Sequence, residues 1–487
     1  MSTGRRLLAG VTWVYGAQLV TVVVQFIYAA VTSRSVAPAG FGAYAVALSV
    51  TGLVSLLATG GLGQTVSRMV DIQRDRLRSL VTYALILGIV GGSILFLSAP
   101  LWAHLWGVDS AIPPIRWLAI SSVASPFLGL STGLMVRLGR FRQLALITVA
   151  SNVSGMMVGA AAVLTWQSAS SLVISSAVAQ IAILCCSLFA TDRHLFGLAK
   201  LKHGRSDIGY SGKLTVASFL AYLTGNITKL SMTRGIDAAS LGYWNRAEVL
   251  TSLPLQQIQN ALIRTVYPEF RHDIADSVRA KIVWTDMLIL IAWIALPLSA
   301  GVAILVPPLV PFVFGDGWET AASLAGPLAI VGGLQVVSTL LSSAIEALGR
   351  FRWIWSTDAI LIAIQVIAAV FIFVYKNMFL AVIALLVTNV VRHGWQVWMA
   401  GRYGYLDVER LLRQYLVAII SSGLVAAVTW SFLELILASN GAHLYWLPTI
   451  LLACAVSAIV FRVRELLPVV VLARRYGFLR HQDRQIS

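Results

Sequence analysis

The stretch that decides the fold runs from Met232 to Phe270 and reads MTRGIDAASLGYWNRAEVLTSLPLQQIQNALIRTVYPEF. An earlier stretch, from Thr32 to Met69, has the same layout: an apolar segment ends near an arginine, turns through small residues and continues into a second segment. When the earlier stretch is shifted by 200 positions, Arg34 aligns with Arg234. Self-similarity at a fixed period indicates a chain built from repeated structural units.

A second recurring motif supports the repeat. The sequence Leu-Gly-Arg-Phe-Arg at Leu138–Arg142 recurs at Leu348–Arg352, with an offset of 210 positions. We therefore predict two lobes of six helices each, residues 1–200 and 201–402. Residues 403–487 are predicted to add two further transmembrane helices and a basic cytoplasmic tail.

The composition is that of a membrane protein. Hydrophobic residues make up 58% of the chain and charged residues 11%, with a mean hydropathy of +0.82. Soluble domains carry about 25% charged residues. The net charge of +16 is then explained by basic cytoplasmic loops, because no stretch is long enough to form a basic soluble domain that binds nucleic acid. The three cysteines lie in apolar runs and form no disulfide or metal-binding pattern.

Fourteen apolar stretches are long enough to cross a bilayer, which takes about 20 residues. They predict an all-α integral membrane protein with two repeat-related lobes and two additional helices. The predicted spans are 7–32, 41–65, 80–104, 114–136, 143–165, 171–191, 213–233, 241–264, 283–306, 321–347, 353–375, 378–399, 414–438 and 445–461.

The positive charges orient these spans. Of the 36 Lys and Arg residues, 30 lie in alternate connections on the side of the N-terminus or in the adjoining parts of the spans. The opposite side carries only four, namely Arg34, Arg116, Arg234 and Lys376. Cytoplasmic loops are rich in Lys and Arg, so both termini and the linker 192–212 are predicted to be cytoplasmic.

Motifs for catalysis or cofactor binding are absent from the sequence. It contains no Walker A loop, no His-Glu-x-x-His and no Asp-x-Asp pair. We therefore expect a protein that is not an enzyme and that uses no cofactor and no catalytic metal.

Basic residues near or within the spans suggest a binding site, because charges at membrane depth usually face a cavity or a partner. Arg34, Lys229, Arg234 and Arg246 are predicted to form a cationic substrate-binding cavity toward the outer side. One alternative is that Arg246 or Lys229 forms a buried ion pair with Glu248. A second is that Arg34 and Arg234 simply extend to the membrane interface.

Three acidic residues in the second half are candidates for ion coupling: Asp358, Glu346 and Asp286. The alternative for each is an ion pair with a nearby cation, namely Arg350, Arg352 or Lys281.

The motifs around these residues resemble a known family. Leu241–Ala247 reads LGYWNRA, Leu253–Gln256 reads LPLQ, Tyr267–Phe270 reads YPEF, and Pro38–Tyr44 reads PAGFGAY. Together they resemble bacterial polysaccharide flippases of the Wzx type, within the multidrug/oligosaccharidyl-lipid/polysaccharide exporter superfamily. The resemblance covers about residues 5–400.

The resemblance implies two six-helix lobes around a central cavity and alternating access in the bacterial inner membrane. It implies transport of undecaprenyl-pyrophosphate-linked oligosaccharide to the outer leaflet, beside glycosyltransferases and a polymerase of the same pathway. Related lipid II flippases use a cationic cavity, which favours the binding role of the basic residues. The alternative is a drug/cation antiporter of the same superfamily, which the lack of an acid in the first span disfavours. A polysaccharide polymerase or ligase is disfavoured because no outer connection is long enough for its substrate loop.

Overall fold

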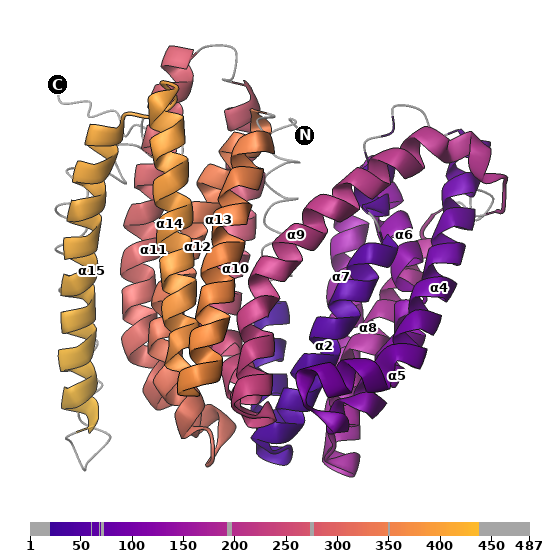
Figure 1. Ribbon diagram of the computed structural model, residues 1–487, viewed down its shortest axis with the longest axis horizontal. Helices are drawn as coiled ribbons and strands as arrows, with labels where there is room; N and C mark the ends of the chain where they lie inside the picture. The colour runs from indigo at the N-terminus through magenta and orange to yellow at the C-terminus, as the bar shows by residue number, and fades with distance from the viewer. Residues whose placement is uncertain are drawn as a thin grey trace, which may run out of the picture. The chain divides into compact units, whose positions relative to one another are not determined.

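The computed structural model describes residues 20–59, 61–67, 69, 73–191, 197–272, 277–348 and 351–437. Over these residues the chain forms helices joined by short connections, with no β-strand. The first helices are the segment Val20–Ser35, α2 (Pro38–Thr59), α3 (Leu62–Ser67), α4 (Arg74–Trp106), α5 (Ile112–Ser122), α6 (Ser125–Arg137), α7 (Phe141–Trp166) and α8 (Ala169–Phe189). They are followed by α9 (Arg205–Gly235), α10 (Ala238–His272), α11 (Ser277–Phe314), α12 (Glu319–Ala347), α13 (Phe351–Tyr375), α14 (Phe379–Arg402) and α15 (Val408–Leu437) (Figure 1).

The predicted class, an all-α multi-pass membrane protein, is confirmed. Nine of the described helices are long and apolar enough to cross a membrane, and the bent pair of α5 and α6 would make a tenth. The count of fourteen stays a prediction, because the span 7–32 begins before the described residues and the span 445–461 lies outside them.

The span predicted over 114–136 corresponds to two helices, α5 and α6. α5 and α6 are bent by 43° relative to each other. Pro126 lies at the start of α6 and has no N–H to continue the ladder of α5. Ser121 and Ser122 donate hydrogen bonds to backbone carbonyls three residues earlier, at 2.9 and 2.8 Å. Proline and serine together account for this break, since both disturb regular helix hydrogen bonding.

α9 and α10 are as long as the spanning helices, at 31 and 35 residues, yet they are not among the nine apolar ones. Polar residues such as Asn226, Lys229, Asn245 and Arg246 lower their apolar character. In a membrane, such residues generally face protein or a water-filled cavity. The two helices that carry Lys229, Arg234 and Arg246 of the predicted cationic site are therefore suited to line an interior.

The described residues fall into two compact units. Unit 1 comprises the chain up to Arg246 together with Val313–Trp318 and Gln365–Ala381. Unit 2 comprises Ala247–Phe312, Glu319–Ile364 and the chain from Val382 onward. The division into residues 1–200, 201–402 and 403–487 was derived from the repeat and stays a prediction.

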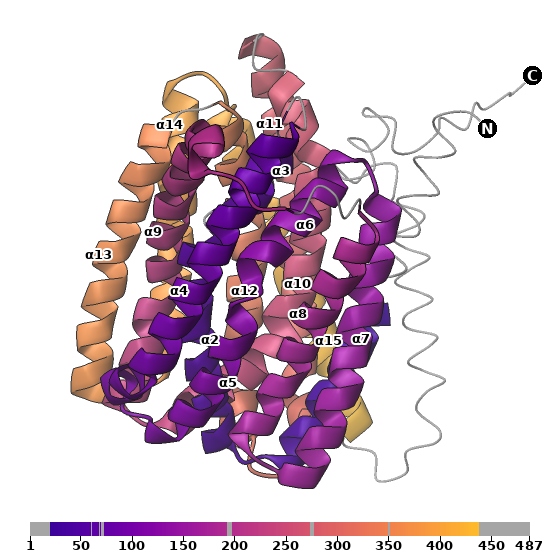
Figure 2. The same ribbon diagram turned by 90° about the vertical axis from the view of Figure 1, so that its right-hand side faces the viewer.

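In unit 1 the segment that follows α8 is attached to the start of α4. The Thr82 hydroxyl donates to the Ala199 carbonyl at 2.9 Å and accepts from the Ala199 N–H at 3.0 Å. Asp207 is only 2% exposed and accepts two N–H groups of Arg76, one of them at 2.7 Å. Figure 2 shows α7 and α8 side by side on another part of this unit, joined by a connection capped by Ser168.

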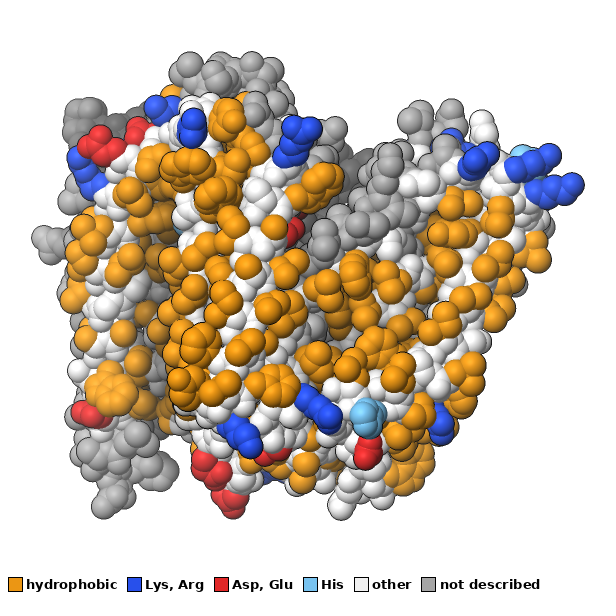
Figure 3. Space-filling model, viewed as in Figure 1, with side chains coloured by type: hydrophobic (Ala, Val, Ile, Leu, Met, Phe, Trp, Pro, Cys, Tyr) orange, Lys and Arg blue, Asp and Glu red, His pale blue; other side chains and the backbone are white. Residues whose placement is uncertain are grey.

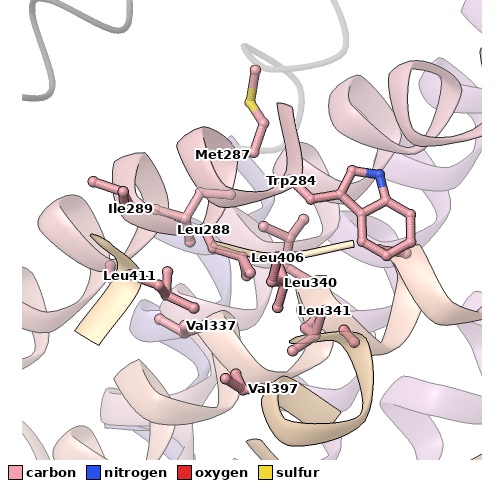
Figure 4. Packing of buried hydrophobic residues seen from close by; sticks show 14 of the residues in the cluster. Trp284, Met287, Leu288, Ile289, Val337, Leu340, Leu341, Val397, Leu406 and Leu411 are labelled. Carbon is pink, nitrogen blue, oxygen red and sulfur yellow. The ribbon is translucent and has the colours of Figure 1, made fainter. Parts of the chain in front are cut away.

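Unit 2 has a hydrophobic core formed mainly by α11 and α12, to which residues of α14 and the start of α15 are added (Figure 4). Asp286, fully buried, forms an ion pair of 2.6 Å with Arg410. The Asp407 N–H donates to the Thr285 hydroxyl at 3.0 Å. α15 is fixed to α11 at this end, whereas only 6% of its apolar span is buried.

The exposed surface of the helices is apolar. Figure 3 shows hydrophobic side chains along the visible helix faces, with most of the visible Lys and Arg near the helix ends. Leu97 and Phe312, for example, are both 77% exposed. Such surfaces suit contact with lipid, because a transmembrane helix presents apolar side chains to the hydrocarbon.

Candidate functional site: a buried arginine on an aromatic cluster

The start of α2 and the start of α10 touch through glycine. A Cβ atom on Gly42 would overlap the carbonyl group of Ala238, and one on Gly242 would overlap the carbonyl group of Pro38. Only glycine allows two helix backbones to approach this closely. These two glycines are the pair that the offset of 200 aligns in the sequence, and in the structure they lie at a mutual contact.

The turn between α11 and α12 packs on the same region of unit 1. Gly315 and Gly317 have φ angles of 86° and 85°, a left-handed conformation that glycine adopts without strain. This turn leads into Trp318, which is 1% exposed and donates its indole N–H to the Ser33 carbonyl at 3.1 Å. Its ring makes edge contacts with Phe41, Phe314 and Tyr243, at centroid distances of 5.4, 5.9 and 5.9 Å.

Arg246 is the buried cation of this region, with 4% of its surface exposed. Its guanidinium carbon lies 3.9 Å from the ring centroid of Phe41 and 5.9 Å from that of Phe314. Both distances are within the range of cation–π attraction. The Nε atom is buried and has no hydrogen-bond partner among the described residues. Tyr28 and Tyr44 lie within electrostatic range of the guanidinium.

The other predicted binding residues lie in different surroundings. Arg34 is exposed, and its Nε donates to the Val313 carbonyl at 3.3 Å. Arg234 is exposed and lies against Gly107 at the end of α4. Lys229 is half-buried. The structure thus brings Arg34 and Arg246 to the same segment, 313–318, whereas a single cavity lined by all four cations stays a prediction.

Arg246 forms no ion pair within the part of the chain that the structure describes. The predicted alternative in which Arg246 pairs with Glu248 therefore differs from the structure. The two side chains are two positions apart on one helix and point to different faces. The alternative that joins Lys229 to Glu248 stays a prediction.

Sequence reasoning missed Phe314 and Trp318 as site residues. Phe41 lies within the PAGFGAY motif, but its contact with Arg246 could not be read from that motif. The signal for the turn was present in Gly315-Asp316-Gly317-Trp318, since glycines on both sides of one polar residue favour a tight turn.

The ion-coupling candidates occupy unit 2. Asp286 pairs with Arg410, a partner that the sequence analysis did not name, and the predicted alternative of a pair with Lys281 stays a prediction. Asp358 lies within electrostatic range of Arg392 on α14 and of Glu346 at the end of α12. Arg350, a predicted alternative partner, lies outside the described residues. The ion-coupling roles stay predictions.

No group of three or more His, Cys, Asp or Glu side chains in the described ranges is arranged to hold a metal ion. The chemistry that the site offers is instead that of a guanidinium. Its planar fork binds the oxygens of phosphate groups, and a charge buried without a carboxylate is costly until an anion pairs with it.

Comparison with known proteins identifies the family. A family model described as "Polysaccharide biosynthesis protein" matches residues 31–323, which is more than half of the chain. The protein belongs to the polysaccharide biosynthesis protein family. This polysaccharide biosynthesis protein is 22% identical to "Lipopolysaccharide biosynthesis protein WzxC" of Escherichia coli (strain K12), over 72% of each chain.

A second relative of this polysaccharide biosynthesis protein is "Teichuronic acid biosynthesis protein TuaB" of Bacillus subtilis (strain 168). The two are 24% identical over 62% of this chain and 63% of the relative. Among solved structures, the lipid II flippase MurJ in an inward closed conformation superposes with a TM-score of 0.70 at 11% identity. The match covers 88% of this chain and 99% of MurJ, and it shows a shared fold.

Proposed function

We propose that this polysaccharide biosynthesis protein is a flippase for undecaprenyl-pyrophosphate-linked oligosaccharide repeat units. It moves them from the cytoplasmic to the outer leaflet by alternating access, for export of a surface polysaccharide. It acts in the bacterial inner membrane, with both termini in the cytoplasm, beside glycosyltransferases and a polymerase of the same pathway. The family match, the relative named for lipopolysaccharide biosynthesis and the fold shared with a lipid II flippase support this function.

The observation that carries the proposal is the environment of Arg246. Its guanidinium is buried, stacked on Phe41, and has an Nε atom without a partner among the described residues. Burying one unpaired ion costs several kcal/mol, so a site of this kind is completed by an anionic ligand. A diphosphate supplies negative oxygens that a guanidinium binds in pairs. A cation exporter would instead need acidic groups at this place.

The remaining cations assist at earlier and later stages of transport. Arg34 and Arg234, both exposed, attract the headgroup at the predicted outer side, and the half-buried Lys229 adds a second positive charge to the polar face of α9. Asp358, Glu346 and Asp286 are the candidates through which an ion gradient drives the cycle. The cluster of Asp358, Glu346 and Arg392 is the better candidate for ion coupling than Asp286, because Asp286 is already paired with Arg410.

The test is transport by the purified full chain in vesicles. A lipid diphosphate that carries a labelled oligosaccharide is placed in one leaflet, and its arrival in the other is followed with an impermeant lectin. Arg246→Ala should abolish arrival. Arg116→Ala is the matched control, since Arg116 also lies over a phenylalanine ring, at 5.3 Å from Phe96, but is exposed. Full transport by Arg246→Ala would contradict the proposal.

A further inference from the structure

We propose that Phe41, Phe314 and Trp318 couple the affinity of Arg246 for an anion to the closure of the outer end of unit 1. The outer end is defined here as the contact of the turn Val313–Trp318 with the start of α2 and the start of α10. The inference rests on the proposed role of Arg246 in binding the diphosphate. It adds that the site is strong only while this end is closed.

Phe41 is a positioning residue. With its guanidinium carbon 3.9 Å from the ring centroid, Arg246 has one face covered by the fully buried Phe41 side chain. The N–H groups of a guanidinium lie in its plane, so a ring that covers the face leaves the edge for phosphate oxygens. The partnerless Nε belongs to that edge. Phe41 therefore holds the Arg246 guanidinium in position before the ligand binds, which lowers the entropy cost of ordering it on binding.

Trp318 holds Phe41 and Phe314 in place. It makes edge contacts with both rings, and its N–H is fixed to the Ser33 carbonyl. The aromatic surface that surrounds Arg246 is thus completed by two residues of the turn, Phe314 and Trp318. If the turn leaves, Arg246 loses Phe314 directly, and Phe41 loses the ring that fixes it.

The turn links unit 1 to helices of unit 2. Its bonds to the rest of unit 1 include the Trp318 bond to the Ser33 carbonyl and the Arg34 bond to the Val313 carbonyl. Its backbone is shaped by Gly315 and Gly317. It is joined covalently to α11 and α12, whose other residues belong to unit 2. A movement of α11 and α12 would pull the turn from Ser33 and Phe41.

Coupling of this kind is reciprocal. If closure strengthens anion binding, a bound anion favours closure by the same factor. Opening of the outer end dismantles the aromatic support of Arg246, weakens the hold on the diphosphate and promotes its release outward. A ligand can shift such an equilibrium only through its different affinity for the two states, and here Phe314 and Trp318 create that difference.

The experiment measures closure and affinity in the same full-length protein. The three native cysteines are replaced by alanine, and Ser33→Cys is introduced as a reporter, since Ser33 is 4% exposed and its backbone carbonyl accepts the Trp318 indole N–H. The purified protein reacts with a fluorescent maleimide with and without inorganic pyrophosphate, and pyrophosphate affinity is measured by calorimetry. We expect slow labelling that pyrophosphate slows further.

Trp318→Leu should accelerate labelling of the reporter and weaken pyrophosphate binding by about tenfold, in line with the loss of a desolvated cation–π environment. Trp318→Phe keeps a ring but loses the bond to Ser33, so it should be intermediate in both measurements, and it replaces the leucine variant if that one does not fold. Trp353→Leu, which removes a buried indole in unit 2, should change neither.

Two results separate the two proposals. If Trp318→Leu accelerates labelling of the reporter while pyrophosphate binds with unchanged affinity, the proposed coupling is wrong and the proposed anion site stands. If Arg246→Ala leaves pyrophosphate affinity unchanged, the anion site itself is wrong, and the coupling is wrong with it.

Discussion

Arg76 and Asp286 hold corresponding positions in the predicted repeat and carry opposite charges. They are separated by the same 210 positions as the two Leu-Gly-Arg-Phe-Arg motifs. Arg76 pairs with Asp207, the third residue of α9, and Asp286 pairs with Arg410, the third residue of α15. An ion pair thus ties α9 to α4, and another ties α15 to α11. In the first pair the cation is on α4, whereas in the second the cation is on α15.

The pair in unit 2 should matter for stability. Asp286→Asn should lower the free energy of unfolding by about 2 kcal/mol, less than for a fully buried pair because Arg410 is 41% exposed. The double exchange Asp286→Arg with Arg410→Asp should recover most of the loss, since the other half uses that polarity. Denaturant unfolding in detergent measures both. Glu409→Gln is the control, because its pair with Arg413 is exposed; an equal loss there would argue against a specific role.

Arg246 should be essential for transport. Arg246→Ala should abolish complementation of a polysaccharide-export defect while the protein stays in the membrane, and Arg246→Lys should be partly active at best, because an ammonium lacks the planar fork. The double change Arg246→Ala with Glu248→Ala should be as inactive as the single change. Immunoblots of membranes check the protein level. Recovery in the double variant would show that Arg246 serves to neutralise Glu248.

Asp358 is the acid to test for ion coupling. Asp358→Asn should remove the dependence of transport on an ion gradient while expression stays normal, because the charge that faces Arg392 and Glu346 is lost. Transport in vesicles with and without an imposed gradient makes the measurement. Unchanged gradient dependence would assign Asp358 to a structural pairing with Arg392.

The glycine contact between α2 and α10 should tolerate no side chain. Gly42→Ala places a methyl group on the Ala238 carbonyl and should destabilise the protein by about 1–3 kcal/mol, as overpacking does. Gly52→Ala on the same helix is the matched control, since its Cβ would meet the Tyr222 ring at an ordinary 3.6 Å. Melting temperatures in detergent compare the two. A Gly42→Ala protein as stable as the Gly52→Ala protein would mean that the helices can separate without cost.

The charge distribution predicts the topology. Reporter fusions after His203 and after Gly401 should give cytoplasmic signals, and a fusion after Asp316 should give an outer one, because Lys and Arg concentrate on the cytoplasmic side. An outer signal after His203 would overturn the orientation and the proposed outer position of the turn at Trp318.

Much of the fold follows from patterns along the chain. A helix long enough to cross a bilayer requires an uninterrupted apolar run, so α7, α8, α12 and α13 could be placed to within a few residues. The bend between α5 and α6 was missed, because an apolar run says nothing about where a proline and two serines disturb the hydrogen bonds within it.

The sequence by itself determined that this is a helical membrane protein. It also predicted an internal repeat and singled out Arg246 as a cation in a polar helix. Composition, hydrophobic periodicity and charge are properties of short stretches of sequence, so they can be read without knowing how the helices pack. Only the tertiary structure decided what surrounds Arg246. The rings of Phe41 and Phe314 reach it from positions 205 residues before and 68 residues after it in the chain. No local pattern encodes a contact of that range, because it depends on how closely Gly42 and Gly242 let their helices approach and on where the turn at Trp318 comes to rest.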